Sequence, residues 1–178
     1  MNWCRFFVLF MVATGVLLVE SGQAEARSVD NGDMLVGLRV PVGGVAGASF
    51  GIGAGLEKMI TPKVGITGAA YYAGYSESLA GVGMGSIEYS YTNILLTAGG
   101  SYHFYTTDKL DLSAGVSLGY NVASVSVSGG GSASGVSAGG FIWSGMAQGR
   151  YFFTPKISGY LGLGYGLGYA TIGLDFKL

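Results

Sequence analysis

The stretch LDLSAGVSLGYNV, residues 110–122, decides the fold. Seven apolar residues, from Leu110 to Val122, occupy every second position, and Asp, Ser, Gly or Asn fills the positions between them. Successive side chains of a β-strand point to opposite faces, so this period of two places an apolar face opposite a small or polar one. The stretch therefore predicts a strand of thirteen residues that is apolar on one side only.

The same alternation recurs along the chain after residue 26. Seven further segments show it, least cleanly near Phe141, where Ile142 and Met146 fall on the other face. Their apolar residues run from Met34 to Val40, Phe50 to Leu56, Val64 to Tyr72, Ile94 to Phe104, Phe141 to Tyr151, Ile157 to Tyr165 and Ile172 to Leu178. The pattern thus predicts eight strands.

A repeated tripeptide separates pairs of these strands. Thr61-Pro62-Lys63 recurs as Thr154-Pro155-Lys156, and Thr107-Asp108-Lys109 lies between them at steps of 46 and 47 residues. Proline presets the dihedral angle of the second residue of a tight turn and ends strand pairing, so we predict a short turn at each site. Each interval is long enough for two strands and one loop.

The composition separates a membrane barrel from soluble alternatives. Alternation alone also fits a soluble sandwich or a lipocalin-like barrel, whose outside carries many charges. Charged residues make up only 11% of this chain, against roughly 25% in an ordinary soluble protein. The sequence therefore predicts an all-β fold, an eight-stranded antiparallel up-and-down transmembrane barrel. After residue 26 the net charge is near zero, which excludes the basic face that binding of nucleic acid needs.

Aromatic residues form two groups along the predicted strands. Such belts are typical of the two interfaces of a bilayer. We predict a belt beside the short turns that contains Tyr102, Phe104, Tyr151 and Phe153, and an opposite belt that contains Tyr71, Tyr72, Tyr75, Tyr120, Phe141, Trp143 and Tyr165.

The first 26 residues have the layout of a secretory signal peptide. Arg5 precedes an unbroken apolar stretch from Phe6 to Val19, and Ala24-Glu25-Ala26 is a small-x-small cleavage site. We predict cleavage after Ala26, with an uncleaved anchor as the alternative, and a barrel domain of residues 27–178.

The C-terminal segment carries a family resemblance. Thr171, Gly173, Phe176 and Leu178 fit the pattern of polar, x, Gly, x, x, apolar, x, apolar, with Leu178 where Phe is commoner. With the size, the strand rhythm and the short turns, the chain resembles the small outer-membrane barrels of the OmpA-like and OmpX/Ail type.

That resemblance implies a place for the barrel and partners for it. The barrel would lie in the outer membrane after export through the periplasm, with outer-membrane lipid around it, and the assembly machinery would recognise its terminal strand. Termini and short turns would face the periplasm. Four loops would lie outside the cell, near residues 41–47, 75–88, 123–137 and 165–169. We expect a monomer.

Six charged residues fall on the small or polar face of the predicted strands. They are Arg39, Glu57, Asp111, Arg150, Asp175 and Lys177. A buried charge needs a partner, and an eight-stranded barrel encloses little more than its own side chains. We therefore predict a lumen plugged by ion pairs, with Arg39 bonded to Asp175 because the first and last strands must meet. A narrow pore is the alternative.

The sequence offers little catalytic chemistry. Two Gly-x-Ser-x-Gly matches, at residues 115–119 and 135–139, lack the following helix of a nucleophile elbow. Some eight-stranded barrels that this chain resembles deacylate lipid A with a His, a Ser and an acid near the outer rim, and that resemblance would implicate Ser101 and His103 in a lipid A-modifying enzyme. The strand directions, however, place His103 at the periplasmic end. A single histidine gives no metal site. We predict no enzyme and no cofactor, and a barrel that displays loops for envelope integrity or surface interaction.

Overall fold

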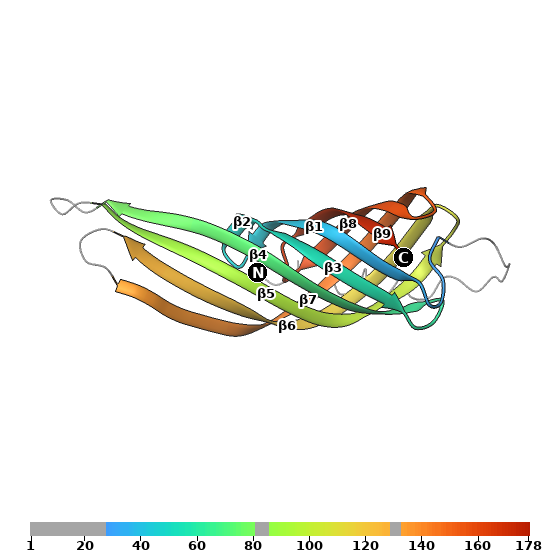
Figure 1. Ribbon diagram of the computed structural model, residues 1–178, viewed down its shortest axis with the longest axis horizontal. Coiled ribbons are helices and arrows are strands. Elements are labelled where there is room, and N and C mark those ends of the chain that lie inside the picture. Colours follow the sequence, from blue (N-terminus) through green and yellow to red (C-terminus); the bar gives the residue numbers. More distant parts are fainter. Residues whose placement is uncertain (1–27, 81–85, 129–132) are drawn as a thin grey trace, which may run out of the picture.

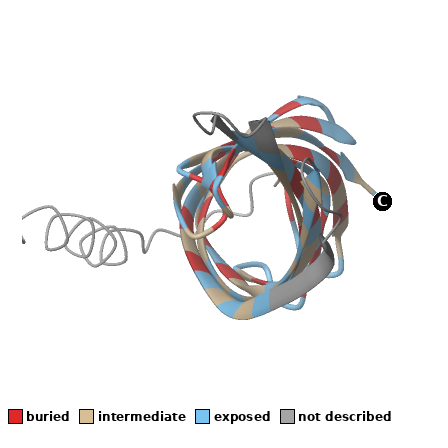
Figure 2. Cartoon of the chain, turned by 90° about the vertical axis from the view of Figure 1, so that its left-hand side faces the viewer, coloured by how far each residue is buried: buried red, intermediate tan, exposed pale blue. Residues whose placement is uncertain are grey.

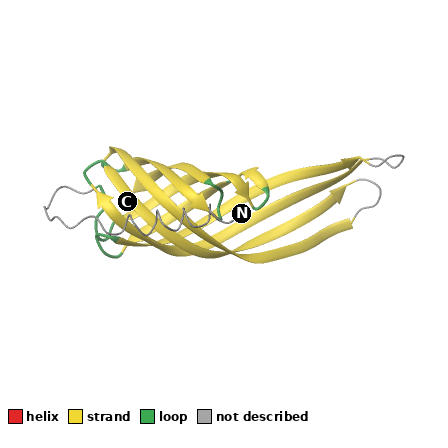
Figure 3. Cartoon of the chain, turned by 180° about the vertical axis from the view of Figure 1, so that it is seen from behind, coloured by secondary structure: helices red, strands yellow, loops and turns green. Residues whose placement is uncertain are grey.

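The computed structural model describes residues 28–80, 86–128 and 133–178, whose regular elements are all strands (Figure 3). No helix in these ranges is long and apolar enough to cross a membrane. The strands are β1 (Met34–Val45), β2 (Ala48–Phe50), β3 (Ile52–Met59), β4 (Val64–Ala80), β5 (Ser86–Thr106), β6 (Leu110–Ser128), β7 (Ala133–Thr154), β8 (Ile157–Tyr165) and β9 (Ala170–Lys177).

The strands close into a barrel, and Figure 2 shows it viewed from one end, down the barrel axis. Each strand from β3 to β9 pairs antiparallel with the next, and β9 pairs with β1 from Leu35↔Lys177 to Val42↔Ala170. Both β2 and β3 pair with β1, so they form one wall strand interrupted at Gly51, whose amide donates to Pro41 O at 2.9 Å. The predicted eight-stranded antiparallel barrel is confirmed.

The two faces of the wall differ as the alternation predicts. Along β6, Val116 and Leu118 point outward and are each 71% exposed, whereas Asp111 and Ser113 point into the lumen and are buried. Outward apolar residues also cover the other strands, for example Ile66, Leu96 and Leu174. An apolar band around a closed barrel is the surface that lipid covers.

The predicted loops at residues 75–88 and 123–137 are wrong, because strands continue through most of both segments. β4 pairs with β5 as far as Ala80↔Ser86, and β6 pairs with β7 from Leu110↔Tyr151 to Val127↔Ala133. We call residues 73–80, 86–93, 121–128 and 133–140 the four-strand extension. It projects beyond the ends of β1, β3, β8 and β9 at one end of the barrel (Figure 1). The Thr-x-Lys turns lie at the opposite end, the turn end.

The polarity of the two faces reverses where the extension begins. Tyr72, Ile94 and Val122 are the last large apolar side chains on the outward faces of β4, β5 and β6 among the described residues. Beyond them the outward face carries hydroxyls, and Ser76 Oγ and Ser90 Oγ lie 3.1 Å apart across β4 and β5. The inward-facing side chains of the extension include Tyr75, Tyr89, Tyr91, Val125 and Val127, all partly buried. The extension is therefore polar on the side where the barrel body is apolar.

Apolar clusters fill the lumen on either side of its charged residues. Val29, Leu35, Met59 and Phe152 form one toward the turn end, and Tyr71, Leu95 and Leu167 form another toward the extension. A third, of Val45, Ala48 and Ala73 with Tyr75, lies at the base of the extension. Tyr71 is thus a lumen residue, 5% exposed, and Tyr75 points inward as well. Their predicted place in an aromatic belt is wrong, because Tyr72, which lies next to Tyr71, takes the outward face.

Candidate functional site

Six ionisable side chains from six strands meet in one layer of the lumen, which we call the charged layer. Each occupies an inward position of its strand, so the alternation that makes the outside apolar brings them together. Six different strands of the barrel wall contribute one side chain each, and each of these side chains is at most 8% exposed. The members are Arg39 on β1, Glu57 on β3, His103 on β5, Asp111 on β6, Arg150 on β7 and Asp175 on β9.

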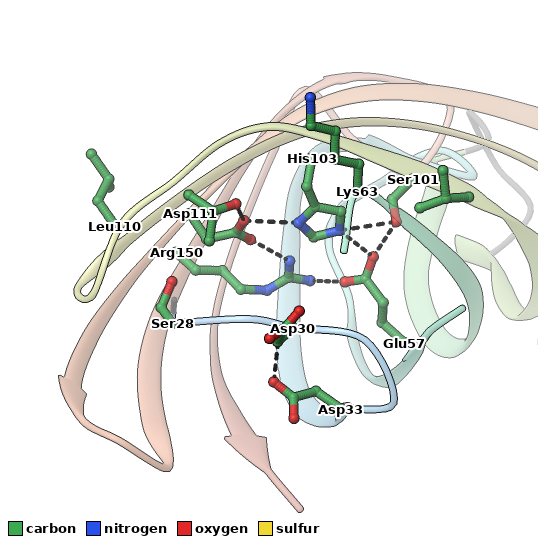
Figure 4. Close-up of polar contacts among 12 residues, drawn as sticks. Ser28, Asp30, Asp33, Glu57, Lys63, Ser101, His103, Leu110, Asp111 and Arg150 are labelled. Carbon is green, nitrogen blue, oxygen red and sulfur yellow. Dashed lines mark hydrogen bonds and ion pairs between the residues drawn. The ribbon is translucent and has the colours of Figure 1, made fainter. Parts of the chain in front are cut away.

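Arg150 is the centre of this layer. Its Nε donates to Asp175 Oδ2 at 2.7 Å and its Nη1 donates to Asp111 Oδ2 at 3.1 Å. Its Nη2 also donates to Glu57 Oε2, and Figure 4 shows the guanidinium between Asp111 and Glu57. A planar guanidinium carries five N–H donors in a fixed fork, so one arginine holds three carboxylates from three different strands.

Arg39 forms the second cationic centre. Its Nη2 donates to both carboxylate oxygens of Asp175, at 2.9 Å each, so the structure places this pair in contact across the β1–β9 seam. The Arg39 Cζ also lies 3.6 Å from the ring centre of Tyr160, and Arg150 Cζ lies 5.4 Å from it. A cation over an aromatic face is stabilised by the ring quadrupole. Sequence reasoning missed Tyr160, although it shares the inward face of β8 with Ser158.

His103 links two of the carboxylates. Its Nδ1 lies 2.8 Å from Asp111 Oδ1 and its Nε2 lies 3.0 Å from Glu57 Oε1. Ionised carboxylates only accept hydrogen bonds, so this arrangement suits an imidazolium with both nitrogens protonated. With that proton, His103, Arg39 and Arg150 balance the three carboxylates. Sequence reasoning left His103 out of the charge network, although strand alternation puts it on the same face as Ser101.

Ser101 completes a chain of contacts that looks like a nucleophile, a base and an acid. Its Oγ lies 3.3 Å from His103 Nε2, whose ring also contacts Asp111. However, the Ser101 hydroxyl donates to Glu57, which the same histidine nitrogen faces (Figure 4). A serine is activated when it donates to its base. Here the hydroxyl donates to a buried carboxylate instead, and Ser101 is only 3% exposed.

Glycines make room for the charged groups. A Cβ added to Gly37 would lie 1.8 Å from Asp175 Oδ1, and one added to Gly65 would lie 2.6 Å from Glu57 Oε1. Real Cβ atoms do not approach other atoms so closely. The glycines of the inward face therefore leave the space that the carboxylates of Asp175 and Glu57 occupy.

Lys177 stands apart from the charged layer. Its Nζ lies 3.3 Å from Asp33 Oδ2 and donates to Ser28 O at 3.0 Å, at the turn end. The sequence predicts that Lys177 belongs to the lumen charge network, but the structure pairs it with Asp33, outside the charged layer. Within the described ranges, no group of His, Cys, Asp and Glu side chains is arranged to hold a metal ion.

The residues of the C-terminal pattern lie on the closing strand. Thr171 is buried in the lumen, and a Cβ on Gly173 would lie 2.3 Å from Leu38 O. Phe176 and Leu178 point outward and are 41% and 70% exposed. The predicted cleavage-site residues Ala24 and Ala26 lie outside the described residues.

The lumen holds a small cavity beside the charged layer. A cavity of about 50 Å³ lies among Arg39, Thr67, Tyr71, Gln148 and Leu167. A buried water needs at least about 10 to 15 Å³ of such space, so the cavity has room for a few waters. The charged layer and the apolar clusters thus place buried side chains at successive levels of the lumen.

The barrel is similar to solved structures of bacterial proteins. No family model matches the sequence, and no curated protein matches it. The N-terminal β-barrel domain of Pseudomonas aeruginosa OprF aligns over 84% of this chain and 100% of its own, with 15% identity and a TM-score of 0.61. The outer membrane protein OprG from Pseudomonas aeruginosa aligns over 86% of this chain and 98% of its own, with 12% identity and a TM-score of 0.61. The chain therefore shares the fold of small outer-membrane β-barrels.

Proposed function

We propose that this protein is a plugged, non-enzymatic barrel of the bacterial outer membrane that presents the four-strand extension at the cell surface for interaction with other molecules. Residues 1–26 would direct export and be removed, which leaves residues 27–178 as the barrel. The turn end would face the periplasm.

The reversal of face polarity carries this proposal. A wall embedded in lipid is apolar outside, as at Leu118, whereas a sheet that stands in water is polar on its exposed side, as at Ser126. Both residues are outward on β6. The change near Val122 therefore marks where the strands leave the bilayer. The aromatic inner face beyond it, with Tyr75 and Tyr91 stacked at a ring distance of 4.6 Å, supports a contact surface.

The composition of the extension also fits a recognition surface. Its described side chains are mainly Tyr, Ser, Asn and Val, with Glu77 and Glu88 as the charged ones. Tyrosine supplies large contact area at a low cost in conformational entropy, and serine and asparagine supply adaptable hydrogen bonds. The pairing of its four strands holds these groups in a fixed arrangement, which lowers the entropic cost of binding.

The filled lumen supports display over transport, the alternative function. Asp111 and Asp175 are bonded to arginines and are 0% exposed, so an ion passing this level would have to break buried pairs. The buried Ser101 and its bond to Glu57 speak against the third alternative, lipid A modification, because a lipid substrate must reach its nucleophile.

Two single-cysteine variants on β6 and one in the turn that precedes it test the orientation. The predicted mature chain has no cysteine of its own, because Cys4 lies in the predicted signal peptide. We expect Ser126→Cys to react with a bulky membrane-impermeant maleimide on intact cells. We expect Asp108→Cys to react only after permeabilisation and Leu118→Cys to stay unlabelled in lipid. Labelling of Asp108→Cys but not Ser126→Cys on intact cells would contradict the proposal.

A shortened variant tests the function of the extension. Replacing residues 75–91 by one Asn-Gly turn and residues 124–137 by another removes most of the extension. Gly74 pairs with Thr92 and Ala123 pairs with Ala138, so each new turn joins two residues that already lie opposite each other, and the barrel body stays intact. The variant should insert and remain heat-modifiable. Adhesion of cells to protein-coated surfaces should rise with the wild type and stay at the empty-vector level with the variant. Equal adhesion with both forms would overturn a role for the extension.

A further inference from the structure

The lysines of this chain all lie at the turn end of the barrel. They occur at positions 58, 63, 109, 156 and 177. Lys177 pairs with Asp33, and Lys58 donates to Gly32 O. At the other end, the described residues of the four-strand extension contain Glu77 and Glu88 but neither lysine nor arginine. The distribution of charge along the barrel axis is therefore strongly asymmetric.

Three of these lysines sit in turns that are built alike. In each turn the threonine Oγ1 accepts a hydrogen bond from the backbone amide of the lysine and another from that of the next residue. The first distances are 3.2, 3.4 and 3.3 Å for Lys63, Lys109 and Lys156. The second are 2.9, 3.0 and 3.0 Å. The threonine side chain thus fixes where the lysine leaves the backbone.

A second set of bonds anchors each turn to the neighbouring strand. The carbonyl oxygens of Lys63, Lys109 and Lys156 accept backbone amides of His103, Phe152 and Lys177, at 2.8 Å in all three cases. The same construction therefore appears three times around the rim. The three lysine side chains are exposed, and none forms an ion pair with another side chain in the described ranges. Asp30, Asp33 and Asp108 are the side-chain carboxylates described at this end of the barrel.

The three lysines lie directly beyond the lipid-facing surface. Outward side chains next to the turns are Ile60, Tyr105, Phe153 and Ile157, between 37% and 63% exposed. Aromatic side chains mark the interface of a bilayer, and the lysines follow on the solvent side of that level, where lipid phosphates lie. A lysine near an anionic membrane surface is attracted to it, and the attraction weakens as salt screens the charges.

We propose that Lys63, Lys109 and Lys156 form a cationic rim that binds the phosphate groups of anionic phospholipids in the leaflet at the turn end. This inference rests on the outer-membrane location proposed above. The rim would favour acidic phospholipid in the first lipid shell and fix the depth of the turn end at the leaflet surface.

Unfolding in vesicles of two compositions tests the rim. Wild type and a Lys63→Gln, Lys109→Gln, Lys156→Gln variant are refolded into phosphatidylcholine with and without phosphatidylglycerol, and urea unfolding is followed at low and at 1 M salt. Wild type should gain at least about tenfold in its folding equilibrium constant from the anionic lipid at low salt. That gain should disappear at 1 M salt, where the screening length is about 3 Å, and in the glutamine variant.

Two control variants separate charge from structure. Arginine at all three positions should keep the gain, and Glu77→Gln with Glu88→Gln, at the opposite end, should leave it unchanged. An equal gain in wild type and the glutamine variant would overturn the rim while leaving the barrel proposal intact. Failure of the wild type to insert into either vesicle would overturn both proposals.

Discussion

The carboxylate of Asp175 occupies the space that a side chain would take on Gly37, its partner across the seam between β1 and β9. A Cβ on Gly37 would lie 1.8 Å from Asp175 Oδ1. The same carboxylate accepts hydrogen bonds from Arg39 and Arg150. The closing seam and the charged layer are thus one structure.

Gly37→Ala should therefore be strongly destabilising. The new methyl group displaces the Asp175 carboxylate and disrupts its bonds to two buried arginines, a loss of about 3 to 5 kcal/mol by comparison with other broken buried pairs. Gly145→Ala is the matched control, because a Cβ there meets nothing within 4 Å. Urea unfolding in detergent or vesicles measures both. Equal stabilities would show that the seam is not packed as described.

Single substitutions in the charged layer should lower the free energy of unfolding in proportion to the number of hydrogen bonds that they remove. Arg150→Met removes one bond from each of three carboxylates and should cost most. Asp175→Asn weakens the bonds of two guanidinium groups, and Arg39→Met should cost least because Asp175 stays bonded to Arg150. The Arg39→Met, Asp175→Asn double variant should lose less than the sum of the two single losses, because neighbours in one network are not additive. Strict additivity in urea unfolding would argue against direct contact.

His103→Ala should weaken folding without changing the lipid of the membrane. It removes bonds to two buried carboxylates, from Glu57 and Asp111. Membranes that overproduce wild type or His103→Ala should both yield unmodified lipid A by mass spectrometry. Loss of acyl chains with the wild type, abolished in the variant, would show that the buried Ser101–His103 contact becomes catalytic.

Phe176→Asp combined with Leu178→Asp should prevent assembly. These side chains are the outward apolar end of β9, and β9 satisfies the backbone edge of β1. Each unpaired backbone group in hydrocarbon costs several kcal/mol, so an open seam is not tolerated. The product should be processed after Ala26, accumulate in the periplasm and be degraded, as cell fractionation would show. Normal amounts of heat-modifiable protein in the outer membrane would refute the role of this strand.

The sequence predicts most of the barrel body because one physical signal repeats there. In β6, the alternation predicts that the segment is a strand, and it also predicts which residues face lipid and which face the lumen. The same rule identifies five inward charges: Arg39, Glu57, Asp111, Arg150 and Asp175. The contact of Arg39 with Asp175 needs only that the first and last strands pair.

The remaining features escape prediction for identifiable reasons. The extension has its apolar face inside and its hydroxyls outside, so segments such as 123–128 lack the outward apolar pattern and look like loops. Tyr71 and Tyr72 are the same residue type and fall in the same predicted belt, but adjacent residues of a strand point to opposite faces, so only Tyr72 is outward. The bonds of His103 depend on which strands lie across the lumen, which alternation does not specify. Lys177 has an inward position by alternation, but it lies at the turn end of β9, too far along the barrel axis to reach the charged layer. Its partner is therefore Asp33.

Single-channel recording tests most directly the central claim that the barrel displays a surface and does not conduct. The refolded wild type, with insertion verified by heat modifiability, is added to a planar bilayer, and a general porin serves as the positive control in the same apparatus. The buried pairs between Arg150, Asp111 and Asp175 predict a flat current trace with no stepwise openings. Discrete, reproducible conductance steps from the wild type would contradict the plugged lumen and favour a pore.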